Sequence, residues 1–540
     1  ETVVPKSQNP ISGAYRRTNE KVPADFSMSA RYRVSRTTFA IVGRERRFKK
    51  NDPLELRIED IAFGGQGIAR IPTEKGPFVI FVQNTFPGQL VRCRVVKCKS
   101  KHAECRLEEV LERAPEEIEP GFQDISGAPY THVPIALQKK LKEDTALDLY
   151  RRIGAVEDVQ SVYRGFVDSP KHWHYRNKME YSFSAILHDP ESGEKIDGFG
   201  LGFKRRGTWW AVENLDGDSG LFDEAVENQL HLLRDWFEAT GLPPWHPPQR
   251  VGFFRFLVVR KSIADDTLLF NLVTSSTGIK EFSREAFIDK MHELFGNRIA
   301  GILHTVNDST GERVESREGS SELIFGKSII TESMHGLKFD ISMSSFFQTN
   351  PSCAERLYAE VIAAIDPAND TLHLGTATQA KQDVVMDLFC GTGTIAQLLV
   401  RHTGMKVIGV DIVADAIENA KISAEKNGTT GVQFHAADVG KFLLEFPEYV
   451  GRIRTIVLDP PRNGISPKTL RKVIRLGAPK MVYVSCNPAT QARDVNTLRE
   501  FGYTMTSLKF VDQFPHTSHV EAVAVFEKTA RSDFQSITPN

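Results

Sequence analysis

Near the end of the chain, one cysteine and one glutamate have the residue types and the placement for covalent chemistry on a ring. Cys486 follows the apolar run that ends at Ser485, and Glu521 precedes another apolar run. A thiolate can add to an electron-poor ring, and a carboxylate can then remove a proton so that the thiolate leaves again. A lone cysteine usually packs in a core, and a lone glutamate usually lies at the surface. Their joint placement beside strands is what favours a catalytic pair.

Carbon 5 of a pyrimidine is the position that needs such a pair. C5 of uracil is too weak a nucleophile to take a methyl group directly, but a thiolate that adds to C6 turns the ring into an enolate with a reactive C5. A general base must then remove the C5 proton. Cys486 and Glu521 are the minimum set for this reaction. His516 and His519 are candidates to orient either group, although a histidine beside a strand is more often structural.

A glycine turn upstream predicts a site for an adenosyl ligand. Gly391 and Gly393 follow the apolar run 384–388 and open a helix, so the backbone there can approach a ligand closely. The third glycine of the dinucleotide fingerprint is missing, and simple packing of the turn is the alternative. Asp411, 18 residues after Gly393, is placed to accept hydrogen bonds from ribose hydroxyls. S-adenosylmethionine is favoured over a dinucleotide because acids end three successive strands: Asp387, Asp411 and Asp438.

The next strand ends in the motif Asp459-Pro-Pro-Arg462. Two consecutive prolines cannot continue a sheet, so the chain leaves it rigidly beside the ligand cleft. An aromatic residue in the fourth position would favour methylation of an exocyclic amine. Arg462 stands there instead, and the motif therefore predicts a different acceptor atom.

The elements that must position these residues alternate between strand and helix beyond Phe346. This alternation predicts an α/β fold with a Rossmann-like, doubly wound and mostly parallel sheet, whose ligands lie at the carboxyl ends of the strands. The expected strands are 384–388, 406–411, 432–434, 455–459 and 481–485.

Two other folded regions are expected before this sheet. Short β-rich runs with glycine turns predict a small OB-like barrel over 51–115, and mixed strands and helices predict an α+β domain over 116–340 with a helix at 135–152. The sheet would then occupy 341–530, followed by a tail at 531–540. Basic residues of the barrel either form a groove for single-stranded nucleic acid or protect a sheet edge; they are Arg92, Arg94, Lys97, Lys99, Lys101 and Arg106.

Composition limits the class of protein. The chain has 540 residues, a net charge of -1, 41% hydrophobic and 25% charged residues, which describes an ordinary globular chain of several domains. Its apolar stretches are too short for a membrane helix. The six cysteines do not make a disulfide framework, so we expect reduced, intracellular thiols.

The first 50 residues are strongly basic, with twelve Lys and Arg against four Asp and Glu. We interpret this segment as a disordered arm; an RNA-contacting tail and the remnant of a transit peptide are the alternatives. A transit peptide would direct the protein to a chloroplast or mitochondrion, whereas its absence would leave the cytoplasm or nucleus. The chain starts at Glu1 without a methionine, so we expect its natural start further upstream. A monomer is the default expectation.

Five motifs occur in the order found in the RNA uracil-C5 methyltransferases of the TrmA/RumA type, which the chain resembles from about Pro53 to Lys528. Residues 54–113 are similar to that family's TRAM domain, and 175–183 are similar to its central domain. The resemblance implies methylation of uridine at C5 in ribosomal or transfer RNA by adenosylmethionine, giving 5-methyluridine. The motifs are Ser345-Phe-Phe-Gln348-Thr-Asn350-Pro351, Asp387-Leu-Phe-Cys-Gly-Thr-Gly393, Asp459-Pro-Pro-Arg462, Ser485-Cys486-Asn-Pro488 and Phe514-Pro-His-Thr-Ser-His-Val-Glu521.

The resemblance also implies roles for single residues. Cys486 would be the nucleophile and Glu521 the proton acceptor. Family members often have Glu in place of Asp411 and Asn in place of Thr394, and both substitutions keep a hydrogen-bonding side chain. The residues implied to contact adenosylmethionine are Gln348, Phe389, Thr394, Asp411 and Asp459.

Many ribosomal-RNA members of that family hold an iron–sulfur cluster, and this chain differs from them at the corresponding place. Those members hold the cluster with four cysteines around the central domain. The corresponding stretch here, 121–132, has no cysteine, and Cys93, Cys98 and Cys105 lie earlier, within the expected barrel. We therefore expect no cluster and no other metal.

Two other functions use much of the same pattern. RNA cytosine-C5 methyltransferases share the thiolate chemistry, but they typically have a Pro-Cys and a Thr-Cys pair, whereas Cys486 stands alone beside Glu521. An RNA-folding factor would keep the fold without the chemistry, although every motif residue is present. The barrel favours ribosomal RNA as the substrate, with transfer RNA as the alternative.

Overall fold

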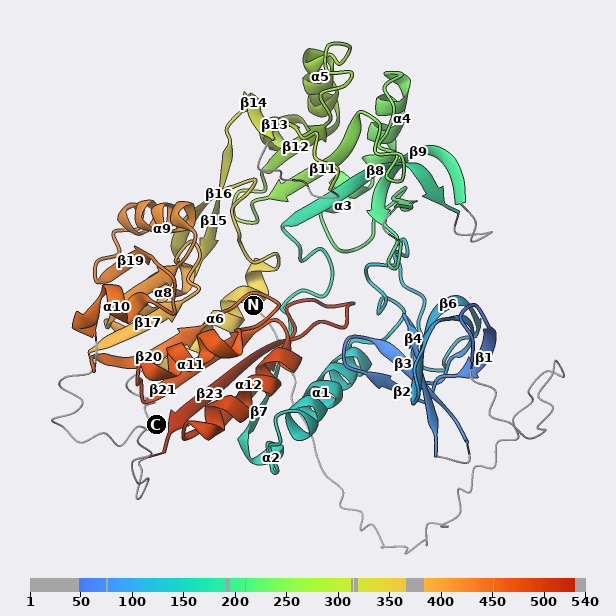
Figure 1. Cartoon of the computed structure of the whole chain (residues 1–540). Coiled ribbons are helices and arrows are strands. Elements are labelled where there is room, and N and C mark those ends of the chain that lie inside the picture. Colours follow the sequence, from blue (N-terminus) through green and yellow to red (C-terminus); the bar gives the residue numbers. More distant parts are fainter. Residues whose placement is uncertain are drawn as a thin grey trace, which may run out of the picture. The chain divides into compact units, whose positions relative to one another are not determined.

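The computed structural model describes residues 48–529, apart from 74–75, 190–194, 209, 312–313, 315–318, 366–382 and 450. The expected basic arm, up to residue 47, and the expected tail lie outside the described residues. Figure 1 shows the order of the elements along the chain. They form a barrel-like sheet, a seven-stranded sheet, a two-stranded ribbon and an eight-stranded sheet.

The first sheet has six strands in the spatial order β1-β5-β6-β4-β3-β2. Side chains alternate along β5, where Val91, Cys93 and Val95 point into the core and the arginines between them point outward. This period of two is what a half-buried strand requires. The strands are β1 (Pro53–Arg57), β2 (Asp60–Ala62), β3 (Gln66–Ile71), β4 (Phe78–Gln83), β5 (Leu90–Cys98) and β6 (His102–Glu112).

Basic residues on β5 do not protect a sheet edge, and that interpretation is wrong. The strand pairs with β1 on one side and with β6 on the other. Its arginines form ion pairs across these ladders: Arg92 with Glu55 at 3.0 Å and with Glu109, and Arg94 with Glu108. Opposite charges on neighbouring strands stabilise such a ladder.

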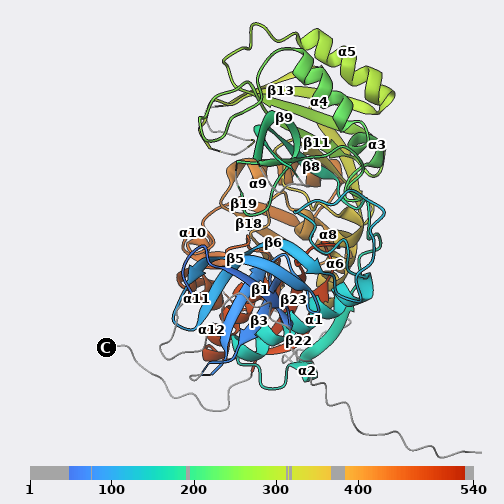
Figure 2. The ribbon, with the colours of Figure 1, turned by 90° about the vertical axis from the view of Figure 1, so that its right-hand side faces the viewer.

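The seven-stranded sheet has the order β10-β9-β8-β11-β12-β13-β14. Its central strands are buried without alternation because both faces are covered. Figures 1 and 2 both place α4 and α5 side by side, and Phe237 and Phe287 of these helices contact each other. The elements are β8 (Lys178–His188), β9 (Lys195–Lys204), β10 (Val212–Asn214), α3 (Glu224–Glu227), α4 (Leu230–Ala239), β11 (Phe254–Lys261), β12 (Leu268–Thr274), α5 (Arg284–Phe295), β13 (Ile299–Val306) and β14 (Ser320–Gly326).

The eight-stranded sheet has the order β19-β18-β17-β20-β21-β23-β22-β7. The first five strands in this order are parallel, β23 runs antiparallel to β21, and β22 runs antiparallel to β23. The two-stranded ribbon of β15 (Ile329–Met334) and β16 (Leu337–Ser342) precedes it. The strands of the sheet are β7 (Tyr163–Val167), β17 (Val384–Leu388), β18 (Lys406–Asp411), β19 (Val432–Ala436), β20 (Ile453–Leu458), β21 (Lys480–Ser485), β22 (Tyr503–Val511) and β23 (Glu521–Lys528).

Helices cover both faces of this sheet (Figure 1), as a doubly wound fold requires. Consecutive strand residues face opposite cores: Met386 packs with α1, α11 and α12, whereas Val385 packs with α6, α8 and α9. The helices are α1 (Ile135–Arg152), α6 (Pro351–Ile365), α8 (Thr394–Thr403), α9 (Ala414–Lys426), α11 (Pro467–Arg475) and α12 (Pro488–Glu500), with short turns at α2 (Val159–Val162) and α10 (Phe442–Glu445).

Two elements from the segment 116–340 belong to this sheet. The expected helix at 135–152 is confirmed as α1, and it packs through Ala146, Leu147 and Tyr150 into the core beneath β20 and β21. Strand β7 pairs in parallel with β22 at the edge of the sheet. Chain segments far from the motifs therefore help to build the sheet that carries them.

Candidate active site

The ends of β21 and β23 bring Cys486 and Glu521 together. The two strands are antiparallel, with Ser485 opposite Ala522. Cys486 follows Ser485 and Glu521 precedes Ala522, so both residues lie at the same level, at the carboxyl edge of the parallel strands. Glu521 is only 4% exposed, and Cys486 is half-buried. The structure therefore places the thiol and the carboxyl group as neighbours.

The Cys486 thiol is held in its protonated form. Burial, followed by the nearby carboxyl groups of Glu521 and Asp459, raises the pKa of Cys486 to about 11, and Arg462 acts in the opposite direction. A thiol is nucleophilic only as the thiolate. Ionisation of Cys486 must therefore accompany a change that the free protein lacks, such as arrival of a polar ring or movement of the Arg462 guanidinium.

Two carboxyl groups at this edge titrate near neutral pH. Burial raises the pKa of Glu521 to about 8, with a further rise from Asp459. Burial also raises the pKa of Asp459 to about 7. Groups with pKa values near the working pH exchange protons most effectively in catalysis. The arrangement can thus take up and release a proton beside a sulfur nucleophile.

The glycine turn lies between β17 and α8. Phe389, Gly391 and Gly393 all have positive φ values of 65°, 52° and 74°. A Cβ atom at Gly393 would lie 2.5 Å from the Phe434 ring, so only glycine fits there. Asp411 accepts hydrogen bonds from the backbone N–H of Gly391 at 3.0 Å and of Val413 at 2.9 Å. These bonds fix the carboxylate beside the turn.

Asp387 is a further site residue, beyond the residues that the resemblance implies as contacts of adenosylmethionine. It is the last residue but one of β17 and is completely buried; neither carboxylate oxygen makes a hydrogen bond of good geometry among the described residues, and the backbone N–H of Ala396 is the group that acts on it from nearby. Burial, followed by the charge of Asp459, holds the pKa of Asp387 well above its usual range. Buried polar groups without partners commonly mark the place where a ligand completes the site. The sequence signal was present, because Asp387 opens the glycine motif.

The residues present fit an adenosyl ligand with a cationic tail. The turn offers close backbone approach, Asp411 offers a fixed carboxylate for a ribose, and Asp387 offers a buried acid without an ion pair among the described residues for an ammonium group. Exposed apolar side chains follow Asp411: Ile412 is 71% and Val413 is 53% exposed. Such a pair can cover the face of a purine. The hydrophobic periodicity of the sequence did not identify these two residues as part of the site.

The other expected contact residues lie at different depths. Gln348 accepts a hydrogen bond from Gln513 Nε2 at 3.3 Å, which links it to the segment before Glu521. Thr394 is buried at the start of α8. Asp438 is exposed and lies two residues beyond the end of β19, next to Ala437, whose N–H donates to the backbone oxygen of Asp411 at 2.9 Å.

Both histidines are uncharged at neutral pH. Burial lowers the pKa of His516 to about 3 and that of His519 to about 4. His516 lies within 3.1 Å of Gln138 Nε2, and His519 lies 3.0 Å from Arg462 Nη2. Among the recorded hydrogen bonds of the described residues, neither ring contacts Cys486 or Glu521.

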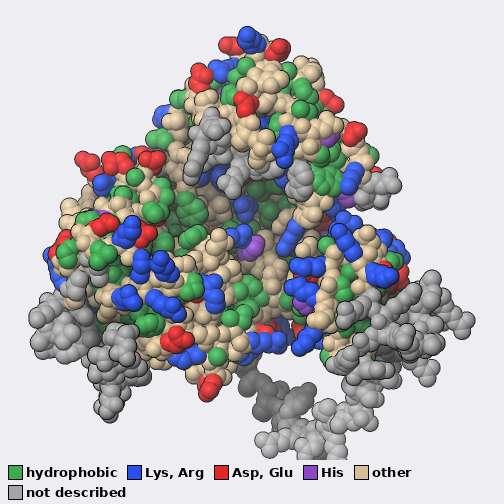
Figure 3. All heavy atoms as spheres, in the orientation of Figure 1, with side chains coloured by type: hydrophobic (Ala, Val, Ile, Leu, Met, Phe, Trp, Pro, Cys, Tyr) green, Lys and Arg blue, Asp and Glu red, His purple; other side chains and the backbone are tan. Residues whose placement is uncertain are grey.

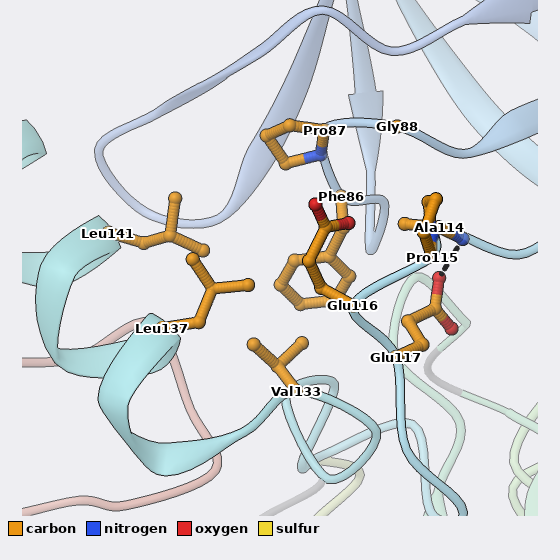
Figure 4. A pocket seen from close by; sticks show the side chains of 10 residues that line it. All are labelled: Phe86, Pro87, Gly88, Ala114, Pro115, Glu116, Glu117, Val133, Leu137 and Leu141. Carbon is orange, nitrogen blue, oxygen red and sulfur yellow. Dashed lines mark hydrogen bonds between the residues drawn. The ribbon is translucent and has the colours of Figure 1, made fainter. Parts of the chain in front are cut away.

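Other possible sites lie elsewhere. Within 48–529 and outside its gaps, no group of three His, Cys, Asp or Glu side chains is arranged to hold a metal ion, and no helix is long and apolar enough to cross a membrane. A cavity of about 270 Å³ is lined by Phe86, Val133, Leu137 and Leu141 with neighbouring residues (Figure 4). None of the expected site residues lines it.

Comparisons with known proteins identify the domains that carry these elements. Residues 379–522 match the family described as a methyltransferase domain, and residues 47–107 match the family described as a TRAM domain. An uncharacterized RNA methyltransferase of Clostridium acetobutylicum is 35% identical, over 89% of this chain and 98% of its own length. One of Caldanaerobacter subterraneus subsp. tengcongensis is also 35% identical, over 89% of this chain and its full length.

A solved structure shares the fold. The tRNA (uracil-54, C5)-methyltransferase of Pyrococcus abyssi, in complex with S-adenosyl-L-homocysteine, is similar with a TM-score of 0.63 and 24% identity, over 88% of this chain and all of that chain. The adenosylmethionine-dependent methyltransferase fold and the TRAM barrel that the sequence predicts are confirmed.

Proposed function

The chain belongs to the RNA methyltransferase family of these relatives, and from this premise we propose that it methylates C5 of a uridine in RNA. The observation that carries the proposal is the register of β21 and β23, which makes Cys486 and Glu521 neighbours at the edge where Asp387 and Asp411 end their strands. Methyl transfer to a pyrimidine ring needs the residues that bind the methyl donor, Asp387 and Asp411, beside the residues that act on the ring, Cys486 and Glu521.

The residues divide the reaction between them. The Cys486 thiolate forms a bond to C6, and the electrons of the C5–C6 double bond move onto the C4 oxygen. Adenosylmethionine supplies the methyl group, which C5 takes as the methyl–sulfur bond breaks. Glu521 then takes the C5 proton, the double bond forms again, and the Cys486 thiolate leaves. Starting from the thiolate, the steps balance: the products are 5-methyluridine, adenosylhomocysteine and one proton held by Glu521, and the Cys486 thiolate is regenerated.

Proton balance explains the unusual pKa values. Binding of the substrate ring must lower the pKa of Cys486 so that its thiol ionises. Arg462 is the cation that favours the thiolate form. Glu521 must be ionised when C5 gives up its proton, although burial favours its neutral form. Both requirements confine the chemistry to a site filled by RNA. A thiolate that formed in the empty site would react with other electrophiles.

An RNA substrate fits the rest of the chain. Many Lys and Arg side chains are visible on the face drawn in Figure 3, and a TRAM domain precedes the methyltransferase sheet. A stacked base cannot present C6 to Cys486, so we expect the target nucleotide to be flipped out of its stack.

Covalent trapping tests the proposal. The protein, adenosylmethionine and RNA containing 5-fluorouridine should give a protein–RNA adduct that survives denaturant, because fluorine at C5 cannot leave as a proton. Cys486→Ala should bind the RNA and yield no adduct. Failure of the natural protein to form an adduct with transfer or ribosomal RNA, or full activity of Cys486→Ala, would contradict the proposal.

Analysis of the modified nucleoside separates the rival chemistries. Digestion of methylated RNA should yield 5-methyluridine. Recovery of 5-methylcytidine would instead favour the cytosine reaction. A Cys486→Ala protein that still supported growth of a strain lacking the natural protein would favour an RNA-folding role.

A further inference from the structure

The segment from Asp512 to Val520 joins β22 to β23 and delivers Glu521 to the active site. Most of its residues are buried, although it has neither helix nor strand structure. A buried loop must find partners for its backbone N–H and C=O groups, because unpaired groups away from water are costly. The source of these partners decides what holds Glu521 in place.

Four successive residues of this loop are held by side chains and backbone from elsewhere. Each partner comes from a segment that precedes the loop by more than 150 residues. Asn350 Nδ2 donates to Gln513 O at 3.1 Å, Lys142 Nζ to Phe514 O at 2.9 Å, Tyr175 Oη to Pro515 O at 3.0 Å and Tyr130 N to His516 O at 3.0 Å, while His516 N donates to Gln138 Oε1 at 2.8 Å.

Lys142 holds the start of the loop with a buried charge. Its side chain is 1% exposed and lies 2.7 Å from Asp512 Oδ1, which is equally buried. The same ammonium group donates to Phe514 O, which also accepts from the Thr517 hydroxyl. A single buried cation thus binds two points of the loop, and its removal would leave Asp512 without a partner.

Gln138 holds the middle of the loop, one helical turn before Lys142 on α1. Its amide receives the His516 N–H and approaches His516 Nδ1 at 3.1 Å. His516 has a φ of 62°, which a non-glycine residue adopts only when its surroundings impose it. The Trp173 ring stacks on the imidazole with 3.5 Å between ring centres.

We propose that Lys142 and Gln138 are positioning residues for the proton-removal step, acting through the loop on Glu521. The proposal rests on the proposed function. A general base must lie within hydrogen-bond reach of the proton that it removes, and errors near 1 Å cost about a hundredfold in rate. Cys486 directly follows β21, and its position does not depend on this loop. Loss of either anchor on α1 should therefore slow proton removal much more than thiolate addition and methyl transfer.

The experiment separates the two halves of the reaction in the full-length protein. RNA carrying tritium at C5 of uridine reports proton removal, and adenosylmethionine with a labelled methyl group reports methyl transfer. The variants are Lys142→Met, Gln138→Leu and the double variant Lys142→Met/Asp512→Leu, which replaces the buried ion pair with apolar groups so that the protein folds without an unpaired charge. Tyr150→Phe is the matched control, because Tyr150 lies on α1 and donates a buried hydrogen bond to Gln491, away from the loop.

The anchor variants should transfer the methyl group in a single turnover at close to the rate of the natural protein. Tritium release should fall by about tenfold or more, and an adduct of Cys486 with ordinary uridine RNA should accumulate. Tyr150→Phe should change neither rate. The adduct with 5-fluorouridine RNA should form normally in every variant, because its formation does not require proton removal.

Two results would overturn the proposal in distinguishable ways. If methyl transfer and tritium release fall by the same factor, or if both keep their natural rates in the folded double variant and in Gln138→Leu, α1 is merely structural. If the natural protein itself forms no adduct with 5-fluorouridine RNA, the proposed function fails and this inference fails with it.

Discussion

The barrel and the carboxyl edge of the eight-stranded sheet both carry many charged side chains, but they treat them in opposite ways. In the barrel, arginines pair with glutamates of neighbouring strands at the surface, as in Arg92–Glu109 and Arg92–Glu55. At the sheet edge, Asp387 and Glu521 are buried and Asp459 is half-buried, and removal from water raises the pKa of each carboxyl group. The arginines of the barrel strands are paired within the barrel, whereas the acids of the sheet edge have no ion pair among the described residues.

This difference indicates where a ligand is needed. Exposed ion pairs contribute little to stability and are easily replaced, so they say little about function. Buried carboxyl groups without partners destabilise the folded chain and persist where a ligand completes them. The comparison therefore assigns chemistry to the sheet edge, and it predicts that the same type of substitution has unequal effects in the two regions.

Replacement of the proposed base should have the largest effect. Glu521→Gln keeps the size of the side chain but removes the group that accepts the C5 proton. Turnover should fall by about 10² to 10⁴, the usual contribution of a general base. Because Cys486 is intact, the variant should accumulate a methylated adduct with ordinary uridine RNA, visible on a denaturing gel. Turnover of Glu521→Gln at more than a tenth of the natural rate would contradict the role of Glu521 as the base, and with it the difference drawn between the sheet edge and the barrel.

Replacement of the buried acid Asp387 should have the next largest effect, on binding of the methyl donor. A carboxylate that meets a cationic ligand gains a charge-assisted hydrogen bond, so Asp387→Asn should weaken binding of adenosylmethionine by about tenfold or more in calorimetry. Asp387 must ionise to make this contact, and calorimetry in buffers of different ionisation enthalpy should show proton release. Asp438→Asn, at an exposed acid near the same turn, should lose less. Equal losses in the two variants would argue against a special role for the buried acid.

The pH dependence of the rate should show the cost of burial. Glu521 acts as a base only when ionised, and burial raises its pKa to about 8. The value of kcat/KM should therefore rise about tenfold for each pH unit below about 8 and level off above it as far as this group is concerned. A profile that is flat from about pH 6 to pH 8 would show that Glu521 is already ionised and that its environment is more polar than the structure indicates.

Local patterns predicted much of this edge. The strand-ending acids and the glycine turn follow from apolar runs and spacing, and α1 follows from its helical period, because each signal lies within about twenty residues of sequence. The anchors of the loop escaped prediction for the opposite reason. Lys142 and Asp512 are 370 residues apart, and a lysine on an amphipathic helix looks like any solvated lysine until its partner is known. Strand β7 joined the sheet across a similar distance.

The barrel offers a smaller test within itself. Lys99 and Lys101 form no ion pair among the described residues, whereas Arg92 contacts two glutamates. Protein cations that neutralise phosphates displace the counterions condensed on the nucleic acid, and unpaired cations are the ones available for this. Lys99→Ala/Lys101→Ala should weaken RNA binding a few-fold and flatten its salt dependence, while Arg92→Gln should leave both nearly unchanged. A larger loss of RNA affinity with Arg92→Gln would mean that RNA displaces the glutamates from Arg92. A surface ion pair would then not show that its arginine serves stability alone.

The smallest expected effect is on stability, and its sign is opposite to the effect on activity. The raised pKa of Glu521 means that the folded chain keeps this proton to higher pH than the unfolded chain does. Its contribution to the free energy of unfolding is thus complete below the ordinary glutamate pKa and is lost as the pH rises through about 8. Gln cannot ionise, so Glu521→Gln should melt about 2 °C above the natural protein at pH 9 and at the same temperature at pH 5. Lower stability of the variant at pH 9 would mean that the ionised carboxylate finds a partner in the folded chain, and the edge would then resemble the barrel.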